Sequence, residues 1–281
     1  TNASPTVQTE RAAIEFEGSS GKMLAVYTNV TANNVAPWKS NVLTPSSGAW
    51  TATTTLPNAG ASSVGRWATL ANGPDDLVAF MAQSSDNTTL TTAPTCDPYI
   101  WSGTASTSAW IKGPTDTTCG NMNQRGGSVR FEAETLDTNR TPQAVYVWVD
   151  GTTALSKAYH TFTYLGTFGT QAAITGANTD DIQYVGGNAA QHSSDMMFVT
   201  NDIDADLKAQ RWDGSSWGTI SAALEASIPD NMNNTRTTWE AFDLAYDRYN
   251  PGMRNWEWFD DAEVSMAAEN GNAALVERLL K

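Results

Sequence analysis

A short sequence theme recurs along this chain about every 50 to 60 residues, and this repetition constrains the fold more than any other feature. Each copy has a polar residue at its start, a short strand of alternating pattern, a polar turn and then a strongly apolar strand. The copies begin near Arg11, Arg66, Ser128, Ile182 and Trp239. One small sheet of this kind leaves apolar faces that it cannot bury alone, so neighbouring copies must stack. The pattern therefore predicts an all-β fold built from diverged repeats.

A third strand is expected in each copy, because a polar turn follows the apolar strand and a Trp signal often closes the unit. Ser-Ser-Gly-Ala-Trp at residues 46–50 and Trp-Asp-Gly-Ser-Ser-Trp at residues 212–217 are the clearest cases. Asp-Gly favours a tight turn between antiparallel strands. The units expected are 11–60, 61–124, 125–179, 180–234 and a partial unit over 235–259. This predicts a β-propeller or propeller-like array of four to five small antiparallel sheets, with a β-sandwich as the competing architecture.

The two ends of the chain depart from the repeat. Residues 1–10 are expected to form an N-terminal arm, and a start at Thr1 without Met favours a processed N-terminus. Residues 260–281 predict a helical tail of two short helices, because acidic residues stand at its start and basic residues at its end. We expect this tail to pack on the β body or on a neighbouring subunit.

The charge of the chain excludes two classes of partner. Thirty acidic residues stand against 16 basic ones, which gives a net charge of −14. A surface of that sign repels both phosphate backbones and anionic membranes, so we expect no nucleic-acid partner. No apolar run approaches the roughly 18 residues that a membrane-spanning helix requires, so no membrane insertion is expected.

Two features fit an extracellular or cell-surface protein. Cys96 and Cys119 are the only cysteines, and they flank a Trp-containing segment that could form a hairpin with its ends together. We predict a disulfide between them, in an oxidising compartment, with two unrelated buried thiols as the alternative. Five sequons are compatible with a glycoprotein, although a chain this rich in Ser and Thr contains roughly four by chance. Their asparagines are Asn2, Asn29, Asn87, Asn139 and Asn233.

The strand and turn motifs resemble the β-propeller repeats of large microbial extracellular and surface proteins. The resemblance covers roughly residues 10 to 250. It rests on Ile-Glu-Phe-Glu at 14–17, Arg-Trp-Ala-Thr-Leu-Ala-Asn-Gly-Pro-Asp-Asp at 66–76, Ala-Phe-Asp-Leu-Ala-Tyr at 241–246, and the closing motif at 212–217. That closing motif is also loosely similar to the Asp-box turn of sialidase-like propellers. It departs from the Asp box because Arg211 precedes Trp212 and because Asp213 directly abuts Gly214.

Four arginines are candidate ligand-binding residues, because each is expected just before the first strand of a unit. They are Arg11, Arg66, Arg125 and Arg236. First strands line the axis of a propeller, and arginines that converge at one mouth could hold a carboxylate through forked hydrogen bonds. Sialidases use an arginine trio in this way, so the resemblance implies a sialidase-like glycoside hydrolase as one function. The alternative is that each arginine pairs with a strand carboxylate and ties neighbouring units together.

Tryptophans are the second set of candidate ligand-binding residues. Trp212 and Trp217, together with Trp38 and Trp101, could present flat aromatic faces to a pyranose ring. At equivalent places in repeats, tryptophans also serve as packing between sheets. Both interpretations remain open at this stage.

An alternating acidic turn is the candidate metal site. Asp202, Asp204 and Asp206 alternate, and Asp213 stands where the last ligand of a calcium loop would fall. Leu207 occupies the position where such a loop requires Gly, so a solvated hairpin turn is the alternative. Calcium is the one cofactor that these residues would hold, and no other cofactor is expected.

Residues suited to catalysis are few. The only histidines, His160 and His192, belong to different units, and the sequence has no nucleophile elbow or phosphate-binding glycine loop. The sequence therefore favours a non-catalytic extracellular protein: an adhesin, a glycan-binding module or a subunit of an extracellular filament or other assembly. Its expected partners are further copies of the chain or surface glycans and proteins.

Overall fold

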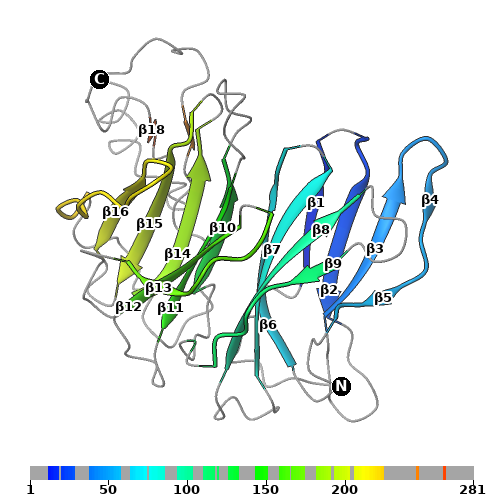
Figure 1. Ribbon diagram of the computed structural model, residues 1–281, viewed down its shortest axis with the longest axis horizontal. Helices are drawn as coiled ribbons and strands as arrows, with labels where there is room; N and C mark the ends of the chain where they lie inside the picture. The colour runs from blue at the N-terminus through cyan, green and yellow to red at the C-terminus, as the bar shows by residue number, and fades with distance from the viewer. Residues whose placement is uncertain are drawn as a thin grey trace, which may run out of the picture.

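The structure is a computed structural model, and in the residues that it describes every regular element is a β-strand (Figure 1). The described residues are 12–18, 20–28, 38–57, 64–74, 76–85, 94–103, 110–117, 119, 126–132, 143–150, 158–164, 166–174, 182–190, 193–202, 206–224, 245–246 and 262–263. These strands form five antiparallel sheets, named sheets 1 to 5 in chain order.

Sheets 1 and 2 are meanders in which consecutive strands pair. Sheet 1 contains β1 (Ala12–Phe16), β2 (Met23–Thr28), β3 (Trp38–Thr44) and β4 (Ala49–Trp50), with β5 (Thr54–Thr55) also paired to β3. Sheet 2 contains β6 (Val64–Asn72), β7 (Leu77–Ser85), β8 (Thr95–Ser102) and β9 (Trp110–Lys112). The second strand of each is a run of apolar residues. A strand between two packed sheets is buried on both faces, as β7 is, whereas β2 is buried only on the face that carries Leu24 and Val26.

Sheets 3 to 5 repeat the same order. Sheet 3 contains β10 (Gly127–Phe131), β11 (Ala144–Asp150), β12 (Ala158–Tyr164) and β13 (Ala172–Ala173). Sheet 4 contains β14 (Ile182–Ala189), β15 (Met196–Asp202) and β16 (Leu207–Trp212). Sheet 5 is described only as the pair β17 (Ala245–Tyr246) and β18 (Ala262–Glu263).

The first strands of successive sheets lie next to one another, which is the arrangement of a propeller. β1 lies against β6, β6 against β10, β10 against β14, and β14 against β17. The start of β10 at Gly127 lies against Trp67 near the start of β6, and Phe131 at its end lies against Gly73, so these two strands run in the same direction. The fold is therefore the predicted all-β, propeller-like array of small antiparallel sheets.

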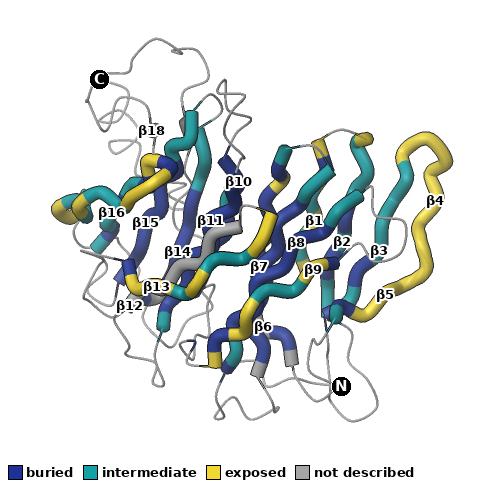
Figure 2. Tube along the Cα trace, viewed as in Figure 1, coloured by how far each residue is buried: buried dark blue, intermediate teal, exposed yellow. Residues whose placement is uncertain are grey.

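Apolar cores lie between sheets 1 and 2, between sheets 2 and 3, and between sheets 3 and 4. Figure 2 shows that the central strands of these sheets are mostly buried. Trp38 and Phe80 belong to the core between sheets 1 and 2. Trp67 and Trp148 belong to the core between sheets 2 and 3, and Phe198 to the core between sheets 3 and 4. The sheets thus obtain their apolar burial from one another, as the repeat pattern predicted.

Buried polar groups also tie neighbouring sheets together. The Asp116 carboxylate, after sheet 2, accepts hydrogen bonds from Trp148 Nε1 at 2.6 Å and from Gln171 Nε2 at 3.1 Å, both in sheet 3. Gln143, beside β11, donates from Nε2 to the Gly214 carbonyl of sheet 4 at 2.6 Å. These bonds satisfy groups that would otherwise be buried without partners.

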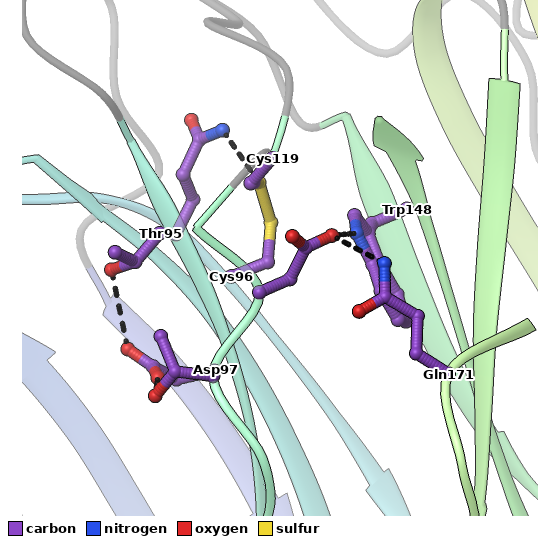
Figure 3. Close-up of a disulfide and its surroundings, with 9 residues drawn as sticks. Thr95, Cys96, Asp97, Cys119, Trp148 and Gln171 are labelled. Carbon is purple, nitrogen blue, oxygen red and sulfur yellow. Dashed lines mark hydrogen bonds between the residues drawn. A yellow bond between two sulfur atoms is a disulfide. The ribbon is translucent and has the colours of Figure 1, made fainter. Parts of the chain in front are cut away.

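The predicted disulfide between Cys96 and Cys119 is confirmed (Figure 3). It joins the beginning of β8 to a segment that also pairs with the sheet through Asp116, whose backbone exchanges two 2.9 Å hydrogen bonds with Cys96. Figure 3 shows the bridge beside Trp148 and Gln171, so the covalent link lies where sheets 2 and 3 meet.

The ends of the chain are described only in part. Residues 1–10 lie outside the described residues. Ala262–Glu263, where the sequence predicted the beginning of a helical tail, form strand β18 instead, because they pair with β17 and tertiary pairing overrides local propensity. The rest of 260–281 lies outside the described residues. In the described part of the chain, no helix has the length and apolar character needed to span a membrane.

Candidate functional site

The candidate site is built at the outer edge of sheet 4. After β16 the chain makes a tight turn at residues 213–216 and returns alongside the same strand. Gly218, Ser221 and Leu224 donate their backbone N–H groups to the carbonyls of Arg211, Ala209 and Leu207, at 2.8, 2.8 and 2.7 Å. The pairing advances by three residues on the returning segment for every two on β16. Because the returning segment contains these extra residues, it bulges away from β16, and space opens beside the strand.

A cleft of about 530 Å³ occupies this space. Its walls come from β15, β16 and the returning segment, and its lining residues are Met197, Ala209, Arg211, Thr219, Ser221, Ala222, Ala223 and Leu224. Side chains alternate along a strand, and the neighbouring residues Met196 and Trp212 belong to the core against sheet 3. The cleft therefore lies on the face of sheet 4 that is turned away from sheet 3.

Arg211 is the one charged residue among the described residues that line the cleft, and it forms an ion pair with Asp195, which is not a lining residue. Arg211 Nη2 donates to both carboxylate oxygens of Asp195, at 2.6 and 2.7 Å. Each side chain is 28% exposed, so the pair is shielded from water on most of its surface. Because Asp195 compensates the charge of Arg211 and holds its guanidinium, this wall offers N–H donors in a fixed position with little net charge.

Ser221 fixes the shape of the opposite wall. Its hydroxyl accepts the Ala209 backbone N–H at 2.9 Å and donates to the Ala222 carbonyl at 2.6 Å. Met197 and Leu224 add apolar surface. A cleft of this volume, with mostly apolar walls and a few fixed polar groups, is typical of a site for a small molecule.

The predicted arginine cluster falls outside the described side chains. Arg66 lies in β6 at a β-bulge between Gly65 and Trp67, and nothing is described of its side chain. Arg11, Arg125 and Arg236 lie outside the described residues. The convergence of these arginines at one mouth therefore stays a prediction.

The predicted aromatic site residues lie in the core. The Trp212 and Trp217 rings pack 5.2 Å apart, and Trp217 packs 5.5 Å from Phe198. Trp212 is 7% exposed, and both rings fill the space between sheets 3 and 4. The structure thus places them as packing between sheets, on the face of β16 opposite the cleft. Trp38 and Trp101 are buried as well.

Of the predicted calcium ligands, Asp202 and Asp206 lie together, and Asp213 lies apart from them. Asp202 accepts Lys208 Nζ at 2.8 Å and the Asp206 backbone N–H at 3.0 Å, at the beginning of β16. Asp213 lies beyond the other end of that strand, and Asp204 lies outside the described residues. Among the residues described, no group of three or more His, Cys, Asp or Glu side chains could hold a metal ion.

Asp213 instead stabilises the turn that leads into the cleft wall. Partial burial alone would raise the pKa of its carboxyl, but hydrogen bonds from the backbone and side chains of Ser216 and Ser215 outweigh that effect and lower the pKa to about 2. Gly214 adopts a φ of +93°, a conformation that glycine accepts without a steric penalty. The five sequon asparagines, Asn2, Asn29, Asn87, Asn139 and Asn233, lie outside the described residues.

Sequence reasoning missed the cleft residues. Arg211 drew notice only as a departure from the Asp-box pattern, yet strand alternation places it opposite the buried Trp212. That alternation was the one available signal. Nothing in the sequence marked the bulged pairing of the returning segment.

Comparisons with known proteins found similar solved structures only. No protein-family model matches the sequence, and no curated protein matches it. The chain is similar to a mutant Aleuria aurantia lectin in complex with α-methyl-L-fucoside, with 16% identity and a TM-score of 0.45, covering 78% of this chain and 62% of the lectin. It is similar to an exo-β-1,3-galactanase from Phanerochaete chrysosporium with β-1,3-galactotriose (9% identity, TM-score 0.42, 76% of this chain and 50% of that one). It is also similar to a Hadza microbial sialidase (9% identity, TM-score 0.44, 76% and 47%). This chain therefore spans less than two thirds of the length of these proteins.

Proposed function

We propose that this protein is a non-catalytic, extracellular glycan-binding module, and that the cleft on sheet 4 holds an uncharged sugar. The observation that supports this proposal most directly is Arg211, which lines a cleft of about 530 Å³ and is held in an ion pair by Asp195. A pyranose presents hydroxyl groups around its edge and C–H groups on its faces. The cleft offers both kinds of complementary surface, with Arg211 and Thr219 on its polar side and Met197 and Leu224 on its apolar side.

The charge state of the pair determines the class of sugar. An arginine without a carboxylate partner would attract an acidic sugar through a forked salt bridge. Here the Arg211 guanidinium already donates to both oxygens of Asp195, so an incoming carboxylate would meet a compensated charge and a nearby anion. A neutral sugar can accept a hydrogen bond from the Arg211 guanidinium without displacing Asp195.

Two properties of the whole chain support an extracellular place of action. The Cys96–Cys119 bridge requires an oxidising environment to form and persist. The net charge of −14 repels nucleic acids and anionic lipids, but it does not repel neutral glycans.

The test is binding of the labelled protein to an array that carries matched neutral and sialylated glycans, followed by calorimetry on the best ligand. Arg211→Gln should weaken binding by about tenfold or more, because a hydrogen bond to a charged group contributes roughly 1.5–3 kcal/mol. Ala223→Trp should abolish binding by filling the cleft from an exposed position. Lys39→Gln, which removes a cation from β3 of sheet 1, is the matched control and should bind like the parent protein.

The outcomes separate the site from the function. Glycan binding that survives both cleft variants would move the site elsewhere on the molecule. Absence of binding to every glycan would refute the proposed function. Release of free sialic acid from the sialylated glycans would favour the sialidase-like hydrolase instead.

A further inference from the structure

A short segment of the chain crosses from sheet 2 to sheet 3. After β9, residues 113–117 run beside β8, where Asp116 and Cys96 exchange two backbone hydrogen bonds of 2.9 Å. Cys119 then pairs with Asp150, at the end of β11 in sheet 3. We call residues 113–117 together with Cys119 the strap. Because its two ends pair with different sheets, the disulfide from Cys119 to Cys96 is a covalent link between sheets 2 and 3.

Side chains of both sheets also contact the strap. The buried Asp116 carboxylate accepts hydrogen bonds from Trp148 and Gln171, and Figure 3 shows these two residues next to the disulfide. Cys119 Sγ accepts a hydrogen bond of 3.1 Å from Gln83 Nε2, on β7 of sheet 2. If the strap moved away from β8, contacts to both sheets would break together.

The pairing between the strap and β8 is weaker than an ordinary strand pairing. Pro98 in β8 accepts a hydrogen bond of 2.8 Å from the Gly113 backbone N–H, but it has no N–H group to return one. Pro114 has no N–H group either. The register also slips, because one side advances from residue 112 to 116 while β8 advances only from 99 to 96. A segment held in this way can open while the sheets stay folded.

One exposed side chain helps to hold the strap on β8. The Thr115 hydroxyl donates to Asp97 Oδ1 at 2.6 Å and accepts a hydrogen bond from Lys112 Nζ at 2.7 Å. Asp97 lies in β8 and Lys112 in β9, and the two form an ion pair at 2.9 Å. Thr115 can therefore be changed without altering the apolar core between sheets 2 and 3.

The disulfide is buried although the outer side of the strap is exposed. Cys96 is 0% exposed and Cys119 1%. The exposed residues of the strap are Pro114, Thr115 and Thr117. A disulfide is reduced when a thiolate attacks one of its sulfur atoms, so the attacking molecule must reach that atom. A dissolved thiol therefore reaches this bond only when the strap has moved away from β8.

We propose that the strap and the Cys96–Cys119 bond form a redox-sensitive latch between sheets 2 and 3. When the strap opens locally, a small dithiol reductant attacks the bond. The two thiols of the reductant are oxidised to a disulfide, and the Cys96–Cys119 bond is reduced to two thiols that take up the two protons. The strap then opens more often, because the covalent link no longer returns it to β8. The proposal is independent of the glycan proposal.

The first test is the rate at which dithiothreitol reduces the full-length chain, measured by alkylation of the new thiols and mass spectrometry. Thr115→Val removes the hydrogen bonds on the outer side of the strap, so it should raise the rate by about tenfold. Thr53→Val is the matched control, because Thr53 is an exposed threonine of sheet 1 whose hydroxyl bonds to Asn41. It should leave the rate unchanged. In the parent protein the rate should depend on urea much less steeply than global unfolding does.

Three outcomes of this test would overturn the proposal. A urea dependence equal to that of global unfolding would mean that the strap does not open by itself. Equal reduction rates for Thr115→Val and Thr53→Val would mean that the strap does not control access to the bond. Reduction of the folded parent as fast as that of the urea-unfolded chain would mean that the sulfur atoms are not protected at all.

Hydrogen exchange provides a second test, in the protein with both cysteines replaced by Ala. The amides of Gly113 and Asp116, which donate to β8, should exchange at least about tenfold faster than in the parent, with little urea dependence. The amides of β2 and β15 should keep the urea dependence of global unfolding in both proteins. Equal acceleration of all these amides, with the urea dependence of global unfolding, would show a uniform loss of stability and overturn the latch. The Thr115→Val measurement decides the question if the double variant does not fold.

Discussion

Gly127 is the position where a single added methyl group should disturb the fold most specifically. It begins β10 and lies directly under the Trp67 indole of the neighbouring sheet. A Cβ placed there would meet Trp67 Cη2 at 2.4 Å and the Val147 carbonyl oxygen at 2.9 Å. Ordinary carbon contacts are about 3.5–4.0 Å, so Gly127→Ala forces either the indole or the backbone of a central strand to move.

The cost follows from how little room the indole has. Trp67 is only 2% exposed and belongs to the core between sheets 2 and 3, so it cannot swing into solvent. Overpacking of a filled core costs about 1–3 kcal/mol. At about 2–4 °C per kcal/mol for a chain of this size, Gly127→Ala should lower Tm by about 2–12 °C.

A double-mutant cycle tests the stated cause. Trp67→Phe removes the ring atoms that the new Cβ would contact. It leaves no hydrogen-bond acceptor unsatisfied, because Trp67 Nε1 has no hydrogen-bond partner in the described part of the chain. Alone it should destabilise the protein through the cavity that it leaves. Together with Gly127→Ala it should destabilise by at least about 1 kcal/mol less than the sum of the two single changes.

The measurement is urea unfolding followed by tryptophan fluorescence and by circular dichroism, for the parent protein, both single variants and the double variant. Coincident transitions with an unchanged m-value are required before the free energies are compared. Additivity within about 0.5 kcal/mol would refute the argument, because it would mean that the methyl group and the indole do not compete for the same space.

Three further predictions concern titratable groups and the disulfide. Hydrogen bonds lower the pKa of Asp213 in the folded protein to about 2. The stability that its ionised carboxyl contributes is therefore fully present above the unfolded pKa of about 4 and is lost as pH falls toward 2. Asp213→Asn should flatten the pH dependence of stability in that window by about 1 kcal/mol or less, since the side chain is exposed. Burial and, to a smaller extent, the charge of Asp97 raise the pKa of Tyr99 in the folded protein. The free energy of unfolding should therefore fall as pH rises above about 10. Absorbance titration of Tyr99→Phe should show one tyrosine fewer that ionises at high pH. Replacing Cys96 and Cys119 together by Ala should cost about 3 kcal/mol in urea unfolding, because the bridge closes a loop with a sequence separation of 23; an unchanged midpoint would contradict that estimate.

The sequence predicts the central strands of the fold well, and for a clear physical reason. Strands buried on both faces need continuous apolar residues, and the runs at 77–80, 144–148 and 196–199 are the cores of β7, β11 and β15. The outermost strands were predicted only as a third or fourth strand of each unit. β5 and β13 are two residues long and exposed, so neither alternation nor hydrophobicity marks them.

The candidate site could not be predicted to the same degree. Trp212 was expected to bind a ligand or to pack between sheets, and local sequence does not say which face of β16 meets sheet 3. Once that face is known, alternation places Trp212 in the core and Arg211 in the cleft together. The cleft depends on the register in which Gly218, Ser221 and Leu224 pair with every second residue of β16. That register is set by how the two segments pair, so the sequence of one segment alone does not predict it.

The same architecture explains why the cleft can form at this edge without weakening the fold. The large buried side chains lie between sheets: Trp67 and Trp148 fill one interface, and Phe198 fills another. The polar ties, such as Trp148 to Asp116, also cross from one sheet to the next. The returning segment beside β16 is held mainly by backbone hydrogen bonds, and those bonds do not depend on the side chains that line the cleft. Exposed lining residues such as Ala223 can therefore be substituted while the interfaces between sheets keep the fold.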